Sequence, residues 1–484
     1  MSEKPSIKKN IAFKLTYQIL AVATPLITAP YASRVLGAGG IGTYSYLSSL
    51  MAYFTMFAAL GTVNYGTREI ARLRDDKYEM SKTFWEIELM TIFTTLVSLV
   101  MWFLLVLLNS DNTNNCLALV PLLIATAADI SWLYTGLEKV QYSVIWNMIC
   151  KILGIILLLA FIKSKDDLTL YILMMSFIQL FGNLSMWMYV RREIVKVNIK
   201  ELHIFRHLKQ TLKYFITSIA ISIYTVLDKT MIGVLTKDVF QNGYYEQATK
   251  IINIVKPFAF TAINDVMTPR MAYLFEKGNL NEVKNRIYKS INVELLLAFG
   301  CCFGIISIAP IFVPLFFGDG YDPVILILQI MAPILIPICL STCTGSHYYV
   351  PSGNILKGTK LTMIGSSVNL LVNVPLILIF GALGATLASL LAETVIGVLY
   401  IYFAREYISV KTVLRVSFTK IIAGIVMFLG ITFMYNSFGL NGFLGLIVEV
   451  ALGLLIYFIM LLVLRDASLI ELKNILVERL NKHG

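Results

Sequence analysis

Charged residues are scarce in this sequence of 484 residues: they form 14% of it, against 57% hydrophobic residues. Soluble proteins carry about 25% charged and about 45–50% apolar residues. The mean hydropathy of +0.75 shows the same imbalance. The shortage of charge excludes an ordinary soluble protein and indicates a chain that lies largely within a membrane.

Histidine and cysteine, the usual protein ligands of transition metals, number only four and six. The cysteines all lie in or beside apolar runs and show no zinc-binding spacing, so the sequence predicts neither disulfides nor a metal site. His203 and His207 have a spacing that could hold a metal on a helix. They lie in a basic segment without a third ligand, and we therefore expect a solvated helix face. No cofactor is predicted.

Long polar segments are also missing. The apolar runs, each of about 20 residues, match the thickness of a bilayer and predict an all-α polytopic membrane protein with about 14 transmembrane helices. The first run continues past Pro25 and Pro30 to Leu36, which is too long for a signal peptide, so we expect an uncleaved first helix. The predicted spans are 12–36, 41–63, 83–108, 116–137, 144–162, 168–189, 212–234, 244–269, 290–317, 323–345, 361–380, 382–403, 418–436 and 442–464.

Lysine and arginine are distributed unevenly between the two sides of these spans. Almost all loop cations fall on the side of the N-terminus, and only Lys163, Lys165 and Lys237 fall on the other. The positive-inside rule then places both termini in the cytoplasm. This asymmetry accounts for the net charge of +11 without a nucleic acid partner. The outer connections, such as 109–115 and 318–322, are too short for a catalytic domain, so we expect a membrane transporter and no enzyme.

Two similar stretches suggest an internal repeat. In "SRVLGAGGIGTYSYL" (33–47) and "DKTMIGVLTKDVFQNGYYEQA" (228–248), a glycine-bearing helix end leads to an outer turn and then to a glycine and tyrosines. Such repeats are usual in secondary transporters. They predict two pseudo-symmetric six-helix lobes, with helices 1–6 in residues 1–190 and helices 7–12 in residues 191–403. Helices 13 and 14 then occupy residues 404–464, and a cytoplasmic amphipathic tail occupies residues 465–484.

Gly37, Gly39 and Gly42 also have the G-x-G-x-x-G spacing of a dinucleotide-binding loop. That motif requires a strand before it and a helix after it. Here the glycines connect two membrane helices on the outer side, so nucleotide binding is rejected. A tight outer hairpin and close packing of the first two helices explain the glycines instead.

Four cations in or near the predicted spans form the candidate substrate site: Arg34, Lys229, Lys250 and Lys256. A charge at mid-bilayer costs about 2.5–3.5 kcal/mol, so charges in spans usually face a polar interior. Lys229 shares a helix face with Ser218, Ser222 and Thr225. We expect the helices that carry Arg34, Lys229, Lys250 and Lys256 to line one water-filled cavity. Its surplus of cations favours an anionic substrate, since lysine and arginine hold phosphate oxygens.

Acidic and amide side chains accompany these cations. The candidates for a supporting or ion-coupling role, with a proton or sodium as the ion, are Asp129, Asp228, Glu246, Asn253 and Glu393. A simpler alternative is that Glu246 and Lys250, four residues apart, form a local ion pair. Glu294 and Glu449 stand alone in their spans, where a structural role is favoured.

Four stretches carry a family resemblance: "RVLGAGGIGTYSY" (34–46), "YGTREIARLRDD" (65–76), "DISWLYTGLE" (129–138) and "LDKTMIGVL…NGYYEQATKI" (227–251). In order and span number, the chain resembles bacterial polysaccharide repeat-unit flippases. These are the O-antigen and capsule translocases of the multidrug/oligosaccharidyl-lipid/polysaccharide exporter superfamily.

The resemblance implies a fourteen-helix fold that works by alternating access in the bacterial cytoplasmic membrane. It implies an oligosaccharide on undecaprenyl pyrophosphate as substrate, flipped from the inner to the outer leaflet for O-antigen or capsule synthesis. The cationic cavity would take the pyrophosphate, while the lipid tail stays in the bilayer. A polysaccharide polymerase and glycosyltransferases are the candidate protein partners.

Alternatives remain at two levels. The cytoplasmic loop motif, which consists of Arg68, Glu69, Arg72 and Arg74, is either an inner gate or a folding anchor. For the whole protein, a drug or cation antiporter of the same superfamily would want a cavity dominated by acids and aromatic residues. A lipid II flippase would move a related substrate, and a membrane polysaccharide polymerase would need a sizeable outer loop.

Overall fold

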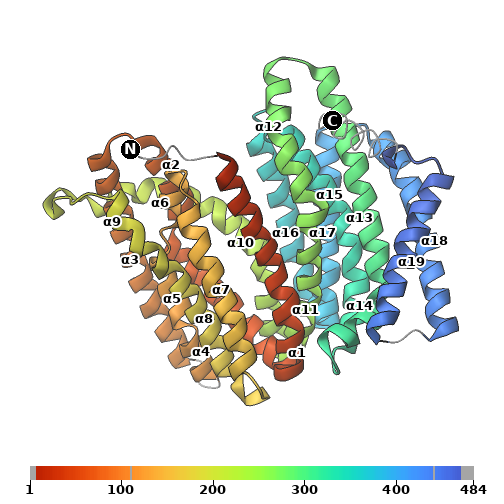
Figure 1. Ribbon diagram of the computed structural model, residues 1–484, viewed down its shortest axis with the longest axis horizontal. Helices are drawn as coiled ribbons and strands as arrows, with labels where there is room; N and C mark the ends of the chain where they lie inside the picture. Colours follow the sequence, from red (N-terminus) through yellow and green to blue (C-terminus); the bar gives the residue numbers. More distant parts are fainter. Residues whose placement is uncertain (1–6, 109–111, 440–441, 470–484) are drawn as a thin grey trace. The chain divides into compact units, whose positions relative to one another are not determined.

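The computed structural model describes residues 7–108, 112–439 and 442–469. Every regular element in this part of the chain is a helix, which confirms the predicted all-α class (Figure 1). The chain divides into two compact units, Met1–Gly233 and Val234–Gly484. The predicted division into residues 1–190, 191–403, 404–464 and 465–484 stays a prediction.

The first unit consists of long apolar helices joined by short ones. Its longer helices are α1 (Ile7–Ala59), α2 (Thr62–Leu73), α3 (Lys77–Leu108), α7 (Gln141–Phe161), α8 (Leu168–Ser185) and α10 (Leu208–Thr236), whose end extends into the second unit. The shorter ones are α4 (Thr113–Ala118), α5 (Val120–Ala127), α6 (Ser131–Gly136), η2 (Lys165–Asp167), η3 (Met186–Tyr189), α9 (Val190–Glu193), η4 (Ile199–Glu201) and η5 (Ile204–His207).

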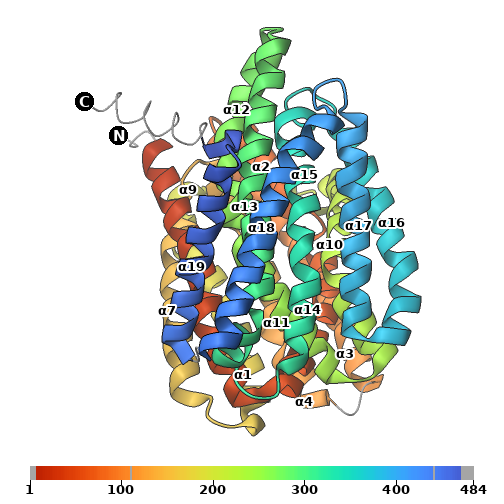
Figure 2. The same ribbon diagram turned by 90° about the vertical axis from the view of Figure 1, so that its right-hand side faces the viewer.

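The second unit contains α11 (Val239–Lys256), α12 (Ala262–Glu276), α13 (Leu280–Phe317), α14 (Asp322–Met331), α15 (Leu335–Thr344), α16 (Ile355–Phe380), α17 (Ala382–Phe403), α18 (Val410–Phe438) and α19 (Gly442–Val463). Three short turns interrupt it: the π-helices η6 (Pro257–Thr261) and η8 (Gly345–Tyr349), and the 3₁₀-helix η7 (Ala332–Ile334). Helices α18 and α19 pack against each other and against α13 (Figure 2).

Eleven helical segments of the described chain are long and apolar enough to cross a bilayer. One of them, Val22–Leu73, extends over 52 residues; it overlaps the first predicted span, 12–36, and includes the second, 41–63. The predicted spans 212–234 and 244–269 coincide with α10 and with α11–α12, which are not among the eleven. The count of fourteen therefore stays a prediction.

Gly37 interrupts α1 between the first two predicted spans. Its backbone has φ 69° and ψ 174°, outside the helical region, while Gly39 and Gly42 of the same motif remain helical. A positive φ is readily adopted only by glycine, so this position requires it. The glycine motif thus marks a break between two helical segments, and residues 7–36, the described part of the chain before it, are helical throughout.

Helix α3 shows why these helices belong in a membrane. Its buried face carries small polar residues, including Thr91, Thr94 and Ser98, whereas Leu107 is exposed. The hydroxyl of Thr94 donates a 2.6 Å hydrogen bond to the carbonyl oxygen of Ala58 on α1. Lipid tails are as apolar as leucine, so membrane helices associate through small residues and buried hydrogen bonds.

The expectation of a solvated face for His203 and His207 is wrong for His207, whose side chain is buried. Its Nε2 lies 2.8 Å from Glu86 Oε2, and its Nδ1 lies 2.7 Å from Tyr65 Oη. The backbone N–H of His203 also donates to Glu86, at 2.9 Å. Glu86 of α3 is itself fully buried, and a buried carboxylate needs such partners.

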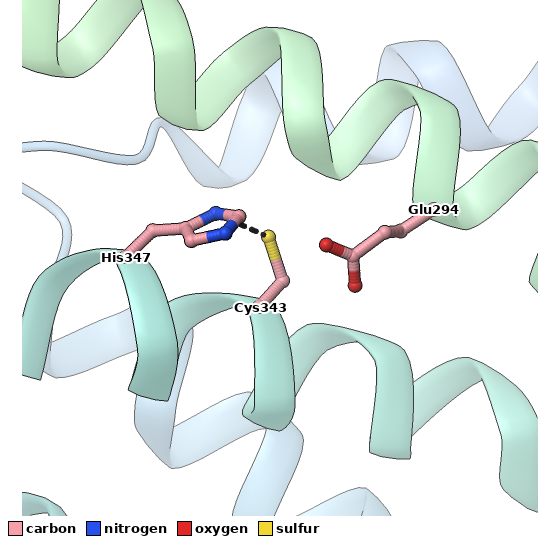
Figure 3. A group of neighbouring side chains, drawn as sticks. All are labelled: Glu294, Cys343 and His347. Atoms are coloured by element: carbon pink, nitrogen blue, oxygen red, sulfur yellow. Dashed lines mark hydrogen bonds between the residues drawn. The ribbon is translucent and has the colours of Figure 1, made fainter. Parts of the chain in front are cut away.

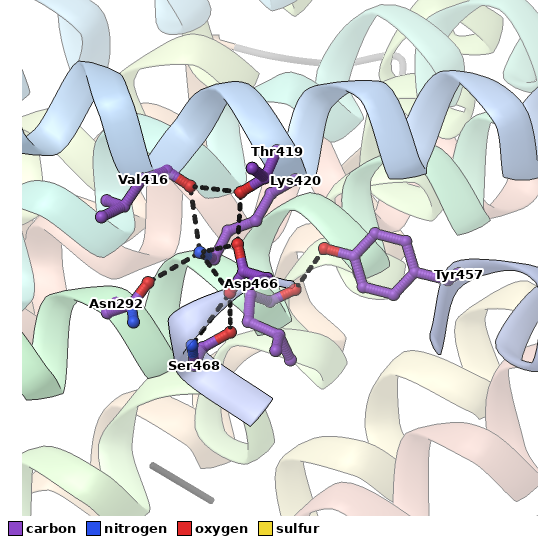
Figure 4. A network of polar contacts seen from close by, with 8 residues as sticks. Asn292, Val416, Thr419, Lys420, Tyr457, Asp466 and Ser468 are labelled. Carbon is purple, nitrogen blue, oxygen red and sulfur yellow. Dashed lines mark hydrogen bonds and ion pairs between the residues drawn. The ribbon is translucent and has the colours of Figure 1, made fainter. Parts of the chain in front are cut away.

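A buried polar network joins α13, α18 and the segment after α19 (Figure 4). The ammonium of Lys420 donates to Asn292 Oδ1 at 2.7 Å and forms an ion pair of 3.1 Å with Asp466. Thr419 and Ser468 also donate to the Asp466 carboxylate. Burial raises the pKa of Asp466, but these hydrogen bonds and the Lys420 charge outweigh it, so its pKa lies below the usual value. Residues 470–484 of the predicted tail lie outside the described part of the chain.

Candidate functional site

The predicted cations of the first unit lie on α1 and α10. Arg34 is exposed, three residues before the break at Gly37, and Lys229 is half-buried next to the buried Asp228. The neighbouring Thr230 donates a 2.9 Å hydrogen bond to Ser49 and so ties α10 to α1. The side chains of Ser218, Ser222 and Thr225, predicted to share the face of Lys229, lie outside the described residues.

In the second unit, Lys250 and Glu246 of α11 form an ion pair with an N–O distance of 3.5 Å. This is the local pair that the sequence left as the simpler alternative. Glu246 is buried and Lys250 half-buried, whereas Asn253, further along the same helix, is exposed. Along the polar face predicted for this helix, the exposure of the side chains therefore increases from Glu246 to Asn253.

The structure brings Lys256 and Glu393 together, although they are far apart in the sequence. Lys256 is the last residue of α11, where the π-helix η6 begins. Glu393 lies on α17, is buried, and is the acid whose charge acts on Lys256. Both lysines predicted to bind substrate in the second unit thus have an acidic neighbour.

Asp129 lines a cavity of about 500 Å³ within the first unit, whose wall carries both polar and apolar side chains. The carboxylate follows α5 and accepts a 3.0 Å hydrogen bond from the backbone N–H of Ser131. Asn183, also on the wall, donates to the carbonyl oxygen of Ala125 at 2.8 Å. Further polar residues of the lining are Ser48, Thr55, Thr126 and Gln179.

Sequence reasoning missed Gln179 and Asn183 as part of a cavity. Both lie in the predicted span 168–189 and are four residues apart, which places them on one face of a helix. Polar residues at that spacing inside an apolar run were the signal that could have identified them.

The arginines of the loop motif that is predicted to be cytoplasmic have partners within the first unit. Arg68 donates to the hydroxyl of Tyr214 at 3.1 Å, and Arg72 pairs with Glu69 at 2.6 Å. Arg74 pairs with Glu138 at 3.2 Å. These contacts tie α2 to α10 and to the connection between α6 and α7. The choice between gate and anchor stays open.

The predicted site residues are distributed over both units. The first unit holds Arg34, Asp129, Asp228 and Lys229, and the second holds Glu246, Lys250, Asn253, Lys256 and Glu393. That they share one cavity stays a prediction.

Known proteins are similar to this one over most of the chain. Residues 7–275 match the model of the family described as "Polysaccharide biosynthesis protein". A putative O-antigen transporter of Escherichia coli (strain K12) is 25% identical over 412 residues, which are 84% of this chain and 98% of that protein. A probable low-salt glycan biosynthesis flippase of Haloferax volcanii, Agl15, is 25% identical over 263 residues, 54% of this chain and 55% of that protein.

Several solved structures resemble this chain in fold, two of which are a lipid II flippase and a multidrug resistance transporter. The lipid II flippase MurJ, in its inward closed conformation, has a TM-score of 0.69 at 16% identity and covers 94% of this chain and 99% of its own. An inward-facing multidrug resistance transporter of the MATE family has a TM-score of 0.59 at 13% identity and covers 81% and 94%. Both likenesses show the fold alone, that of a polytopic helical membrane protein.

Proposed function

Because the chain belongs to the polysaccharide biosynthesis protein family, we propose that it is a flippase for lipid-linked oligosaccharide repeat units in surface polysaccharide synthesis. The observation that carries the proposal is the match to an O-antigen transporter over 98% of that protein's length. The likeness to MurJ supports a fold able to accommodate a lipid-linked sugar. We further propose undecaprenyl pyrophosphate as the lipid carrier, the cytoplasmic membrane as the location, and alternating access as the mechanism.

The chemistry of such a substrate fits the half-buried lysines. A glycan headgroup with a pyrophosphate cannot cross hydrocarbon unaided, since each unpaired polar group costs several kcal/mol there. We propose that Lys250 compensates part of the pyrophosphate charge. Its contact with Glu246 is 3.5 Å long, which is longer than the roughly 2.7–2.9 Å of a strong charge-assisted hydrogen bond. Substrate oxygens can therefore compete for this ammonium group. Lys229 and Lys256 are the further candidates.

The test is complementation of a flippase-null strain together with a flipping assay in proteoliposomes. The liposomes contain purified full-length protein and a fluorescent undecaprenyl-pyrophosphate-linked glycan. Lys250→Ala should lower the apparent affinity for this glycan about 10- to 100-fold, the effect of losing one hydrogen bond to a charged group. Glu246→Gln should raise the affinity, because it removes the competing carboxylate.

Lys237→Gln is the matched control, because Lys237 is exposed between α10 and α11. This substitution should leave flipping unchanged. Normal flipping by Lys250→Ala would remove Lys250 from the substrate site. Failure of the unaltered protein to flip the glycan or to restore surface polysaccharide would contradict the proposed function itself.

A further inference from the structure

Three buried side chains of the second unit meet between α13 and α15 (Figure 3). Glu294 comes from α13, Cys343 from α15 and His347 from the π-helix η8 that continues it. One potential ligand atom from each side chain lies within 4.8 Å of the other two. All three residues are fully buried, so the cluster is enclosed by protein.

The polar atoms of this cluster have few hydrogen-bond partners within the protein. Both carboxylate oxygens of Glu294 and the Nε2 atom of His347 lack a hydrogen-bond partner. Cys343 and Asn264 are the polar groups that act on the carboxyl group, but neither makes a well-formed hydrogen bond to it. The one contact within the cluster joins Cys343 Sγ and His347 Nδ1 at 3.2 Å. Buried polar groups normally have partners, so the arrangement lacks one component.

We propose that Glu294, Cys343 and His347 bind a divalent transition-metal ion of the zinc type. A thiolate, an imidazole and a carboxylate form a ligand set that suits zinc, whereas magnesium and calcium prefer oxygen ligands alone. The charges also balance, since a thiolate and a carboxylate together neutralise a divalent cation. On binding, the thiol of Cys343 releases its proton to water, and no oxidation or reduction takes place.

The geometry allows the three groups to share one ion. Cys343 and His347 are four residues apart on consecutive helical turns, so their side chains leave the same face. Zinc bonds of about 2.3 Å to sulfur and about 2.0–2.1 Å to nitrogen place the two ligand atoms of one ion within about 4 Å of each other, and the measured separation is 3.2 Å. Asn264 Oδ1, also buried without a hydrogen bond, offers a further oxygen next to Glu294.

The position of the cluster suggests what the ion does. It lies near the start of the predicted span 290–317 and near the end of the predicted span 323–345, away from Gly318–Asp322, the turn that joins α13 to α14. On the predicted topology these ends of the two spans face the cytoplasm, where reducing conditions keep cysteine as a thiol. The π-helix η8 supplies His347, and π-helical turns often occur at functional sites. A bound ion would link α13 to α15 and η8 within the second unit.

The experiment uses the full-length protein in detergent, stripped of metal with a chelator and titrated with Co²⁺ and then Zn²⁺. We expect one Co²⁺ per chain, with visible absorption of a tetrahedral site and a near-ultraviolet thiolate-to-metal band. Zn²⁺ should displace the cobalt and abolish both signals. Cys343→Ser should lose the thiolate band and weaken binding by about 100-fold or more, since even residues behind the ligands contribute about 10–100-fold.

Glu294→Gln and His347→Gln should weaken Co²⁺ binding while leaving the thiolate band at saturating Co²⁺. Cys302→Ser is the matched control, because Cys302 is a buried cysteine on α13 and lies outside the cluster. Absence of stoichiometric cobalt from the unaltered protein, or a thiolate band that survives in Cys343→Ser, would overturn the proposal. The cobalt readout is independent of glycan flipping, so the two proposals fail separately.

Discussion

Gly66 of α2 lies so close to Trp132 of α6 that a Cβ atom at this position would come within 2.5 Å of the indole ring. Trp132 is fully buried among Ile70, Phe84 and other apolar side chains, so the ring has little room to move. The absence of a side chain at Gly66 therefore sets how closely α2 and α6 approach.

Gly66→Ala is expected to destabilise the protein by about 1–3 kcal/mol, the usual effect of an extra methyl group in a packed core. Thermal unfolding in detergent, followed by tryptophan fluorescence, measures the change. Gly304→Ala is the control, because a Cβ on this glycine of α13 meets nothing within 4 Å. Equal melting temperatures for the two variants would show that α2 and α6 can move apart without a loss of folding free energy.

Asp466→Asn is expected to destabilise the second unit by about 3–5 kcal/mol, because it leaves the buried Lys420 charge without its counterion. Replacing both residues by apolar ones, as in Lys420→Met with Asp466→Leu, should cost less than either single change. Denaturation by heat in a double-mutant cycle measures the coupling. Additive effects of the two changes would contradict the ion pair.

The same pair predicts a pH dependence. The pKa of Asp466 is lower in the folded protein than its ordinary value of 3.8, so the folded state favours the charged form. Its contribution to stability is present above pH 3.8 and is lost as the pH falls through the lower folded value. Melting temperatures of the unaltered protein and of Asp466→Asn should therefore converge on acidification. A constant difference across that range would contradict the assignment.

Arg74→Ala is expected to change stability by less than about 1 kcal/mol, because exposed ion pairs contribute little. Both side chains of the Arg74–Glu138 pair are about half exposed, at 50% and 53%. Complementation at matched protein levels then separates the two roles left open for this motif. Normal surface polysaccharide excludes a gate role for Arg74, whereas loss of polysaccharide with an unchanged melting temperature indicates a gate, and a lowered melting temperature indicates an anchor.

The predicted orientation is tested by single cysteines in a cysteine-free background. Cysteines at Asn112 and Ser437 should react with a membrane-impermeant thiol reagent added to intact cells. A cysteine at Lys77 should react only after the membrane is opened, although Lys77 is exposed on the protein surface. Labelling of the Lys77 position from outside would reverse the topology.

Features that depend on local sequence could be predicted. Apolar runs identified the long helices, because a bilayer imposes their length, and the glycine motif identified the break that Gly37 makes in α1. The pairing of Glu246 with Lys250 was foreseen as an alternative, because residues four apart on a helix are neighbours. The motifs also led to the correct family.

Features that depend on tertiary packing could not be predicted. His207 is buried because Glu86, 121 positions away, needs a partner, and no local pattern contains that need. Cys343 and His347 lie four residues apart, which alone predicts no metal site, and Glu294 reaches them only because α13 packs against α15. The charge of Glu393 likewise reaches Lys256 only because α11 packs against α17.

The Lys420–Asp466 pair also constrains the order in which the chain can mature. The ribosome makes Lys420 46 residues before Asp466, so α18 enters the membrane carrying a lysine whose counterion does not yet exist. Until α19 has been inserted and the next few residues have emerged, Lys420 can donate only to the neutral acceptors Asn292 and Val416. A nascent chain that stops before Asp466 would thus keep a buried cation without its carboxylate, a defect that membrane proteases can recognise.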